Sequence, residues 1–537
     1  MMVFLTALLA SALPAQGQLS PRDSVVHALN RLGFGAGPGQ VELLAGTGVM
    51  RWIESQLAVR QPGDPALGGY ESRLDVLHTS REDLVKRFSE LQRSRLQARR
   101  DSTLPRDRSR ATAARREFRD AALELQQATV VRAALSRNQL AEVMADFWFN
   151  HFNVHLAKGL GRVLTPSYVE ETIRPNALGK FENLLLAVAK SPAMLFYLDN
   201  VQSVAPGSVP PRLARLERGR GRLGRRLDPD RRQRLDSLME LAEQRRPTGL
   251  NENYARELLE LHTLGVDGGY TQKDVTEVAR VLTGWGIALP RDGAGFRFHD
   301  WAHDNGDKVV LGVTYRGGEA EGVRLIRMLA SHPATMHHVS AKLCARLVSD
   351  LMPDGCTDAA VAAWKRSRGD IREVVRAIVR SPDFWAPAAV AGKVKTPLEF
   401  LVSAVRAVGG NPDSTTRLSQ QLVRLGQPLF HQSVPTGYPE TQDEWVNSGA
   451  LLTRMNLAVA LAAGRLDGVV VNLDQVVPAS ADRSAMVEQV NRAILGGRMS
   501  QRTREIIQQE ISELTDPVMA RALAVGLALG GPEFQRQ

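Results

Sequence analysis

Apolar side chains recur every three or four residues along most of the chain, which is the period of an α-helix. Several predicted helices also have typical ends: Asn251 can cap a helix that stops at Gly265, and Thr271 with Asp274 forms a capping-box sequence before a helix that stops at Gly284. The pattern therefore predicts an all-α protein of packed helical subdomains. The helices are expected over residues 24–33, 39–58, 81–100, 111–136, 138–156, 166–190, 252–264, 272–283, 319–330, 334–351, 357–367, 370–380, 396–408, 447–463, 483–495 and 500–530.

Strand patterns are rare and lie close together. Residues 296–301 and 309–315 are rich in aromatic and β-branched side chains, and they flank the Asn305-Gly306 turn. An Asn-Gly pair between two such segments favours a hairpin. We therefore expect one short β-hairpin-like excursion from the helical body.

With 537 residues, the chain is too long for one simple core. We expect a main helical domain over residues 18–475 and a C-terminal helical segment, residues 476–537, that packs on it. Within the main domain, residues 206–247 are rich in Arg, Gly and Pro. This composition predicts an exposed, partly disordered insertion with one short helix at 229–244.

The insertion has two interpretations. It can be a solvated, variable loop, or an arm that binds anions. No aromatic side chain is available to stack on bases, so nucleic acid is not the expected ligand. The candidate anion-binding residues are Arg212, Arg215, Arg225, Arg226, Arg231 and Arg232.

The first seventeen residues are typical of a signal peptide. An apolar run from Val3 to Leu13 is too short to span a bilayer, and Ala15-Gln16-Gly17 fits a signal-peptidase site. No later apolar run approaches eighteen residues. We therefore expect an exported protein, periplasmic or extracellular, without a transmembrane span.

The chain has only two cysteines, Cys344 and Cys356. In an oxidising compartment they could form a disulfide, and two free, buried thiols fit the sequence equally well. Two cysteines are too few for a Cys-type zinc site.

A formal net charge of +10 permits binding to an anionic polymer or surface, although it specifies no fold. The chain has no Gly-x-Ser-x-Gly elbow, no P-loop, no Gly-x-Gly-x-x-Gly after a strand and no Cys-x-x-Cys. A nucleophilic serine and a nucleotide site therefore have no support from motifs.

The segment 140–156 has two histidines on the apolar face of its predicted helix. His151 and His155 lie one turn apart, whereas Glu142, Asp146 and Asn153 share the opposite face. A pair at this spacing can bind one divalent metal ion, and apolar surroundings favour the neutral imidazole that metals require. No Glu follows His151, so the metalloprotease pattern is absent. The alternative is two core histidines that are hydrogen-bonded to neighbouring groups.

Two further segments could complete such a site. His262 lies on a buried helix face and could be a third metal ligand, while Glu257 and Glu260 could act as acid–base groups. His303 and Asp304 belong to a loop dense in His and Asp, where scaffold-held side chains often carry function. The alternatives are a surface salt-bridge lattice with a core histidine, and a turn with side-chain caps.

Together these segments resemble one large bacterial family, catalogued as domain of unknown function 1800. The resemblance extends from about His27 to Phe534 and implies an exported helical protein. Such proteins are often encoded beside a secreted partner of alkaline-phosphatase or sulfatase fold, and the family offers no catalytic residues to transfer. The motifs are Phe147-Trp-Phe-Asn-His-Phe152, Asn251-Glu-Asn-Tyr-Ala-Arg-Glu-Leu-Leu-Glu260, Leu282-Thr-Gly-Trp285, His303-Asp304, His332-Pro333, Lys342-Leu343, Lys395-Thr-Pro397, Gly426-Gln-Pro428 and Pro532-Glu-Phe534.

Three functions follow as hypotheses. The chain could be a binding or assembly partner of a secreted phosphatase- or sulfatase-like protein, or of an anionic surface polymer. It could be a metal- or acid–base-dependent hydrolase that uses the His, Glu and Asp side chains named above. It could also be a structural envelope protein without a small-molecule site.

Overall fold

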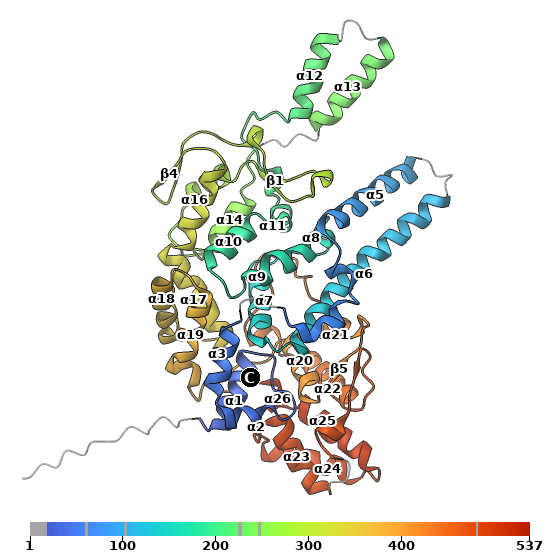
Figure 1. The fold of residues 1–537 in the computed structure, drawn as a ribbon, viewed down its shortest axis with the longest axis vertical. Coiled ribbons are helices and arrows are strands. Elements are labelled where there is room, and N and C mark those ends of the chain that lie inside the picture. The colour runs from blue at the N-terminus through green and yellow to red at the C-terminus, as the bar shows by residue number, and fades with distance from the viewer. Residues whose placement is uncertain (1–18, 60–62, 101–104, 224–227, 245–248, 479–481) are drawn as a thin grey trace, which may run out of the picture.

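The computed structural model describes residues 19–59, 63–100, 105–223, 228–244, 249–478 and 482–537. The expected signal peptide therefore lies outside the described residues. Most of the described residues are helical, and the few strands are two or three residues long (Figure 1). The helical spacing thus predicted the all-α class correctly. None of the described helices is long and apolar enough to cross a membrane.

The helices of the first half of the chain run from the N-terminal cluster to the motif segment at residue 253. They are α1 (Pro21–Arg31), α2 (Gln40–Thr47), α3 (Val49–Leu57), α4 (Gly68–Glu71), α5 (Arg81–Arg100), α6 (Pro105–Leu135), α7 (Gln139–His151), α8 (Gly161–Ser167), α9 (Arg174–Asn176), α10 (Phe181–Ala189), α11 (Pro192–Tyr197), α12 (Pro211–Leu223), α13 (Pro229–Gln244) and α14 (Asn253–Glu260). A π-helix, Tyr168–Ile173, joins α8 to α9.

The second half of the chain continues with helices from residue 272 to residue 535. They are α15 (Gln272–Val281), α16 (Glu319–Ala330), α17 (Pro333–Leu347), α18 (Asp354–Ser367), α19 (Ile371–Arg380), α20 (Pro397–Ala407), α21 (Arg417–Arg424), α22 (Ser448–Ala462), α23 (Arg483–Leu495), α24 (Gln501–Ser512), α25 (Pro517–Gly530) and α26 (Pro532–Gln535). Helices α22 to α25 pack against one another. The expected division of the chain at residue 475 stays a prediction.

The strands form separate two-stranded pairs. β1 (Trp285–Ile287) pairs with β2 (Phe296–Phe298), β3 (Lys308–Val310) with β4 (Val313–Tyr315), and β5 (Asn411–Pro412) with β6 (Val469–Val470). The expected excursion is present, but segments 296–301 and 309–315 do not pair with each other. The reason is local, because Leu311 and Gly312 both have positive φ and close a two-residue hairpin turn inside the second segment.

The insertion at 206–247 is an antiparallel helical hairpin rather than a loop with one helix. The helix expected at 229–244 is present as α13, and α12 packs against it although it was not predicted. The amide of Val204 donates to the carbonyl of Gly249 at 3.1 Å, so the two ends of the hairpin meet at its base. In Figure 1 the hairpin extends away from the rest of the molecule, and the pair α5–α6 forms a second projection.

One continuous apolar core links helices from α1 to α26, with α7 in its interior. Trp148 of α7 is fully buried, as are Tyr254 of α14 and Phe181 of α10. Cys344 of α17 and Cys356 of α18 form a disulfide, which settles their pairing. The core and this crosslink hold the elements around α7 in fixed positions.

Candidate functional site

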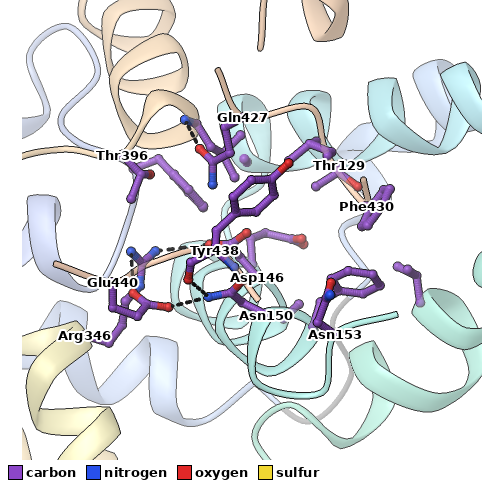
Figure 2. Close-up of a pocket in the computed structure, with 18 of the residues that line it drawn as sticks. Thr129, Asp146, Asn150, Asn153, Arg346, Thr396, Gln427, Phe430, Tyr438 and Glu440 are labelled. Atoms are coloured by element: carbon purple, nitrogen blue, oxygen red, sulfur yellow. Dashed lines mark hydrogen bonds and ion pairs between the residues drawn. The ribbon is translucent and has the colours of Figure 1, made fainter. Parts of the chain in front are cut away.

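Helix α7 has a polar face that is turned into the protein. Glu142, Asp146 and Asn150 follow one another at intervals of four residues, so they lie in one row along the helix, and Asn153 continues the row beyond its end. Figure 2 shows Asp146, Asn150 and Asn153 pointing toward the segment 427–440, which lies opposite. We call this segment the 427–440 loop.

The row of polar side chains and the 427–440 loop enclose a small pocket of about 50 Å³. This volume admits a few water molecules or the end of a small ligand. Apolar side chains, including Phe149, Leu398 and Phe430, form much of its wall. Its polar lining consists of Thr129, Glu142, Asp146, Asn150, Asn153, Arg174, Arg346, Thr396, Gln427, Tyr438 and Glu440.

Arg346 of α17 joins three carboxylates at one end of the pocket. Its Nη1 lies 2.5 Å from Oε1 of Glu399 and 3.7 Å from Oε2 of Glu440, and its Nη2 lies 3.3 Å from Oδ2 of Asp146. The Arg346 side chain is only 4% exposed. A guanidinium buried to this degree requires such partners, because an unpaired charge inside a protein is strongly unfavourable.

Glu399 and Glu440 have further hydrogen bonds that use their remaining oxygens. Glu399 is part of a capping box at the start of α20, where its Oε2 accepts from the amide of Thr396 at 2.8 Å. Glu440 Oε1 accepts from Nδ2 of Asn150 at 3.0 Å. Burial alone would raise the pKa of Glu399, but Arg346 and the hydrogen bonds outweigh it and lower that pKa. Glu399 is therefore a fixed counter-ion.

Asp146 differs from these two carboxylates. Among the described residues, its ion pair is the 3.3 Å contact with Arg346 alone, and a quarter of its side chain is exposed to the pocket. Burial raises the pKa of Asp146 to about 7; Arg346 opposes the rise, and the negative charges of Glu440 and Glu399 add to it. Asp146 can therefore gain or lose a proton near neutral pH, whereas Arg346 and the hydrogen bonds keep Glu399 ionised.

At the other end of the polar row, Glu142 forms an ion pair with Arg174. The two side chains form a bidentate pair, with N–O distances of 2.5 and 3.0 Å. Glu170 accepts from Arg132 at 2.6 Å, and Arg132 also reaches Glu71 at 2.6 Å. Both oxygens of Glu142 are thus occupied, and this pair fixes one wall of the pocket.

The 427–440 loop is held over the pocket by the two asparagines. Asn150 Nδ2 donates to the carbonyl of Tyr438 at 2.8 Å, and Asn150 Oδ1 accepts from the amide of Tyr438 at 2.6 Å. Asn153 Nδ2 donates to the carbonyls of Gln432 and Val434 at 3.0 and 2.7 Å. These side chains replace the backbone pairing that an irregular loop lacks, and they keep the pocket covered.

Comparison with known families agrees with the motifs. The family model described as a protein of unknown function, DUF1800, matches residues 27–536. The chain belongs to the DUF1800 family. This match runs from within α1 to the end of α26 and includes every segment that forms the pocket. No curated protein and no solved structure matches this DUF1800 chain.

The predicted metal-binding histidines of this DUF1800 protein separate into two groups. His151 and His262 are neighbours, with ring centroids 6.3 Å apart and His151 Nε2 at 3.2 Å from the carbonyl of His262. The ring of His338 of α17, which was not predicted, also lies near His151, with 6.4 Å between the ring centroids. His155 instead lies beside His431, with 6.0 Å between the centroids of the two rings. In the part of the chain that the structure describes, no three His, Cys, Asp or Glu side chains are arranged to hold a metal ion.

The buried histidines are held in the neutral form. Burial, with a contribution from the charge of Lys342, lowers the pKa of His262 to about 3 and that of His338 to about 4. The same causes place the pKa of His151 well below its ordinary value. Neither ring nitrogen of His262 has a hydrogen-bond partner among the described residues. The neutral rings of His151, His262 and His338 therefore lie together in the core beside α7.

The predicted acid–base residues belong to other local networks. Glu257 and Glu260 lie half-buried on α14; burial and the charge of Glu260 raise the pKa of Glu257, and Tyr270 donates to Glu260 at 3.3 Å. His303 Nδ1 donates to the carbonyl of Thr283 at 2.7 Å.

Asp304 pairs with Arg280, at 2.8 Å between its Oδ2 and the arginine Nε. Among the described contacts, none of these four predicted residues meets the histidines of α7. A catalytic role for them stays a prediction.

The candidate anion-binding arginines lie on the α12–α13 hairpin. Arg215, Arg231 and Arg232 are exposed, and Arg231 is 3.3 Å from Asp228. The side chain of Arg212 and all of Arg225 and Arg226 lie outside what the structure describes. Their role in binding stays a prediction.

The sequence analysis assigned the chemistry of α7 to its histidine face and therefore missed the pocket. The available signal was the recurrence of Glu142, Asp146 and Asn150 every four residues in an otherwise apolar helix. A polar row on a buried helix requires polar partners from elsewhere in the chain. Arg346 and Glu440, which are those partners, have no sequence motif that marks them.

Proposed function

We propose that this DUF1800 protein is a hydrolase in which Asp146 is the general acid–base. The observation that supports the proposal is the state of Asp146 itself. It is the pocket carboxyl with a pKa near 7, a partly exposed side chain and a single, long ion pair. A catalytic group is most effective when its pKa lies near the working pH.

The chemistry follows from the two protonation states of one carboxyl group. In the ionised form, Asp146 accepts a proton from a water molecule as that water attacks the substrate. In the protonated form, it returns the proton to the departing oxygen or nitrogen. Arg346 keeps the carboxylate oriented, while Glu399 and Glu440 balance the arginine charge. The pocket of about 50 Å³ receives only the reacting end of a substrate.

Two measurements test this function. The carboxyl carbon of Asp146, followed by NMR against pH, should titrate near pH 7. Hydrolysis of small chromogenic esters, phosphates and glycosides should show an inflection at the same pH and should be lost in Asp146→Asn. Asp267→Asn, which changes an exposed aspartate, is the matched control. Titration near pH 4, or full activity in Asp146→Asn, would contradict the proposal.

A second function is supported by the hairpin α12–α13. Its described arginines are exposed on an arm that extends from the molecule (Figure 1), and the chain as a whole carries a net charge of +10. We infer that the arm binds an anionic surface polymer. The acidic face of an exported phosphatase- or sulfatase-like partner would be attracted by the same charge. Binding to a sulfated polysaccharide such as heparin should weaken as salt is raised through the physiological range.

We also propose that the protein is exported. The disulfide between Cys344 and Cys356 supports this location, because disulfides persist in oxidising compartments and are rare in the cytosol. N-terminal sequencing of the protein recovered from a periplasmic extract should begin at or near Gln18. Recovery of the full-length chain from the cytosol alone, with reduced cysteines, would contradict export.

A further inference from the structure

An open groove of about 1020 Å³ lies on the outer side of the 427–440 loop, beside α6. The loop separates it from the pocket: Phe430 lines the pocket, whereas Pro428 and His431 line the groove. The floor of the groove is aliphatic and includes Leu123 and Leu156. A depression of this size with a mainly apolar lining is typical of a site for an organic ligand.

The charged residues of the groove are all cationic. Arg116 and Arg119 of α6 and Arg162 of α8 line it, and no Asp or Glu does. Arg116 and Arg162 form no ion pair with any residue that the structure describes, and Arg119 contacts only its neighbour Asp120. All three arginines are exposed. The groove therefore has positive charges that the rest of the described protein leaves available for a ligand.

The α6 residues that line the groove lie in a row along the helix. Arg116, Arg119, Leu123 and Gln126 follow at intervals of three or four residues, so they form one stripe along the helix. Ten residues of helix correspond to about 15 Å. Along α6 the stripe begins with Arg116 and Arg119 and continues with Leu123 and Gln126, while Arg162 of α8 lies near His431. An elongated ligand with one charged end and one apolar chain matches this order.

We propose that the groove binds a single-chain anionic amphiphile, namely a fatty acid. Its chain would cover Leu123 and the exposed Val423, and its carboxylate would pair with Arg116 and Arg119 of α6. Among the described residues, no Phe, Tyr or Trp lines the groove, which argues against stacked bases or sugars. This binding does not depend on the acid–base role of Asp146.

The test uses the full chain and isothermal titration with dodecanoate, decanoate and dodecyl maltoside. Dodecanoate should bind with a one-to-one stoichiometry, and decanoate should bind roughly tenfold more weakly because it loses two buried methylene groups. The neutral maltoside should bind weakly or not at all. Raising the salt concentration should weaken dodecanoate binding.

Two variants locate the site. Val423→Glu places a negative charge on the floor at a side chain that is 58% exposed, so the fold should be retained and binding should be lost. Arg119→Gln should weaken binding several-fold, whereas Arg502→Gln, an exposed arginine of α24, should bind as the unaltered chain does. Equal binding of maltoside and dodecanoate, no dodecanoate binding, or binding unaffected by Val423→Glu would overturn the proposal. If an acidic amphipathic peptide binds in the groove and dodecanoate does not, the ligand is a protein and the proposal is equally wrong.

Discussion

Asp146 and Glu399 share one guanidinium, yet their pKa values move in opposite directions. Glu399 lies 2.5 Å from Arg346 and also accepts the amide of Thr396, so its ionised form is stabilised. Asp146 has only the 3.3 Å contact with Arg346, and burial dominates its pKa. The number and length of the contacts, rather than the type of residue, thus decide which carboxyl group can exchange a proton.

Replacing Asp146 by Asn should stabilise the protein at alkaline pH. The folded-state pKa is about 7 and the ordinary value is 3.8, so between these limits the folded state holds the extra proton and the free energy of unfolding falls as pH rises. At pH 8 the variant should be more stable by roughly 2–4 kcal/mol, because a shift of one pKa unit corresponds to about 1.4 kcal/mol. Urea unfolding at pH 8, 6 and 4.5 measures the difference, which should shrink as pH is lowered. A constant difference, or one shared by Asp267→Asn, would show that the Asp146 carboxyl is not the cause.

The buried histidines should make the protein sensitive to acid. With a folded-state pKa of about 3 against 6.5, His262 stays neutral in the folded protein while the unfolded chain takes up a proton, so stability is lost as pH falls from 6.5 toward 3. His262→Leu should reduce this loss by up to about 1.4 kcal/mol per pH unit and should change stability little at pH 7, because it also removes two unpartnered nitrogens. Unfolding between pH 7 and 4 checks this, with the exposed His337→Leu as control. A bound metal that His262→Leu releases would instead support the metal-site hypothesis.

At the scale of elements, the 427–440 loop depends on the lack of a side chain at Gly437. Gly437 has a φ of +76°, and a Cβ there would overlap the backbone oxygen of Asn150. Gly426 has a similar φ of +91° but has open space around it. Gly426→Ala should therefore cost only the strain of a positive φ, about 1–2 kcal/mol.

Gly437→Ala should cost at least about 2 kcal/mol more than Gly426→Ala. The added methyl group must displace Tyr438 and break its two hydrogen bonds with Asn150, each of which is worth about 1 kcal/mol. Thermal or urea unfolding of the two variants measures the difference. Equal losses would mean that the Asn150 contacts with the loop contribute nothing measurable.

Several helices have the predicted bounds, whereas the helix expected over 252–264 ends at Glu260 as α14. Residues 81–100, 319–330 and 483–495 are helical over the predicted ranges as α5, α16 and α23. The range 39–58 is divided because Gly48 has a φ of +96°, and 500–530 is divided before Pro517. Helix α12 was not predicted, because its Arg and Gly content resembles that of a disordered segment. Its packing against α13 favours the helix nevertheless.

At the scale of the whole molecule, the fold class could be predicted and the site could not. Hydrophobic periodicity is a local property, and it predicted most of the longer helices without reference to the others. The pocket instead combines α7 with Arg346, about 200 residues later, and with Glu440, about 290 residues later. No periodic pattern encodes such distant contacts, so the sequence indicated polar candidates on α7 but not their partners.

The arrangement of the α12–α13 hairpin allows the arm and the body to be tested separately. Its ends meet at the hydrogen bond between Val204 and Gly249, so a short Gly-Ser linker in place of residues 207–247 should close the chain without strain. Of the hairpin residues that the structure describes, none belongs to the main apolar core or lines the pocket. The shortened protein should therefore keep its melting temperature within a few degrees and retain the Asp146 titration near pH 7.

Removal of the hairpin should affect charge-dependent binding alone. The segment 206–247 contains twelve arginines and six acidic residues, so its removal takes away a surplus of positive charge. The shortened protein should elute from a heparin column at lower salt than the full chain. A matched variant with Arg215, Arg231 and Arg232 changed to Gln keeps the hairpin and should show part of the same decrease, because charge rather than shape carries the interaction. Unchanged elution of both proteins would place the polymer contact on the body, and unchanged elution of the triple variant alone would assign it to the other arginines of the arm.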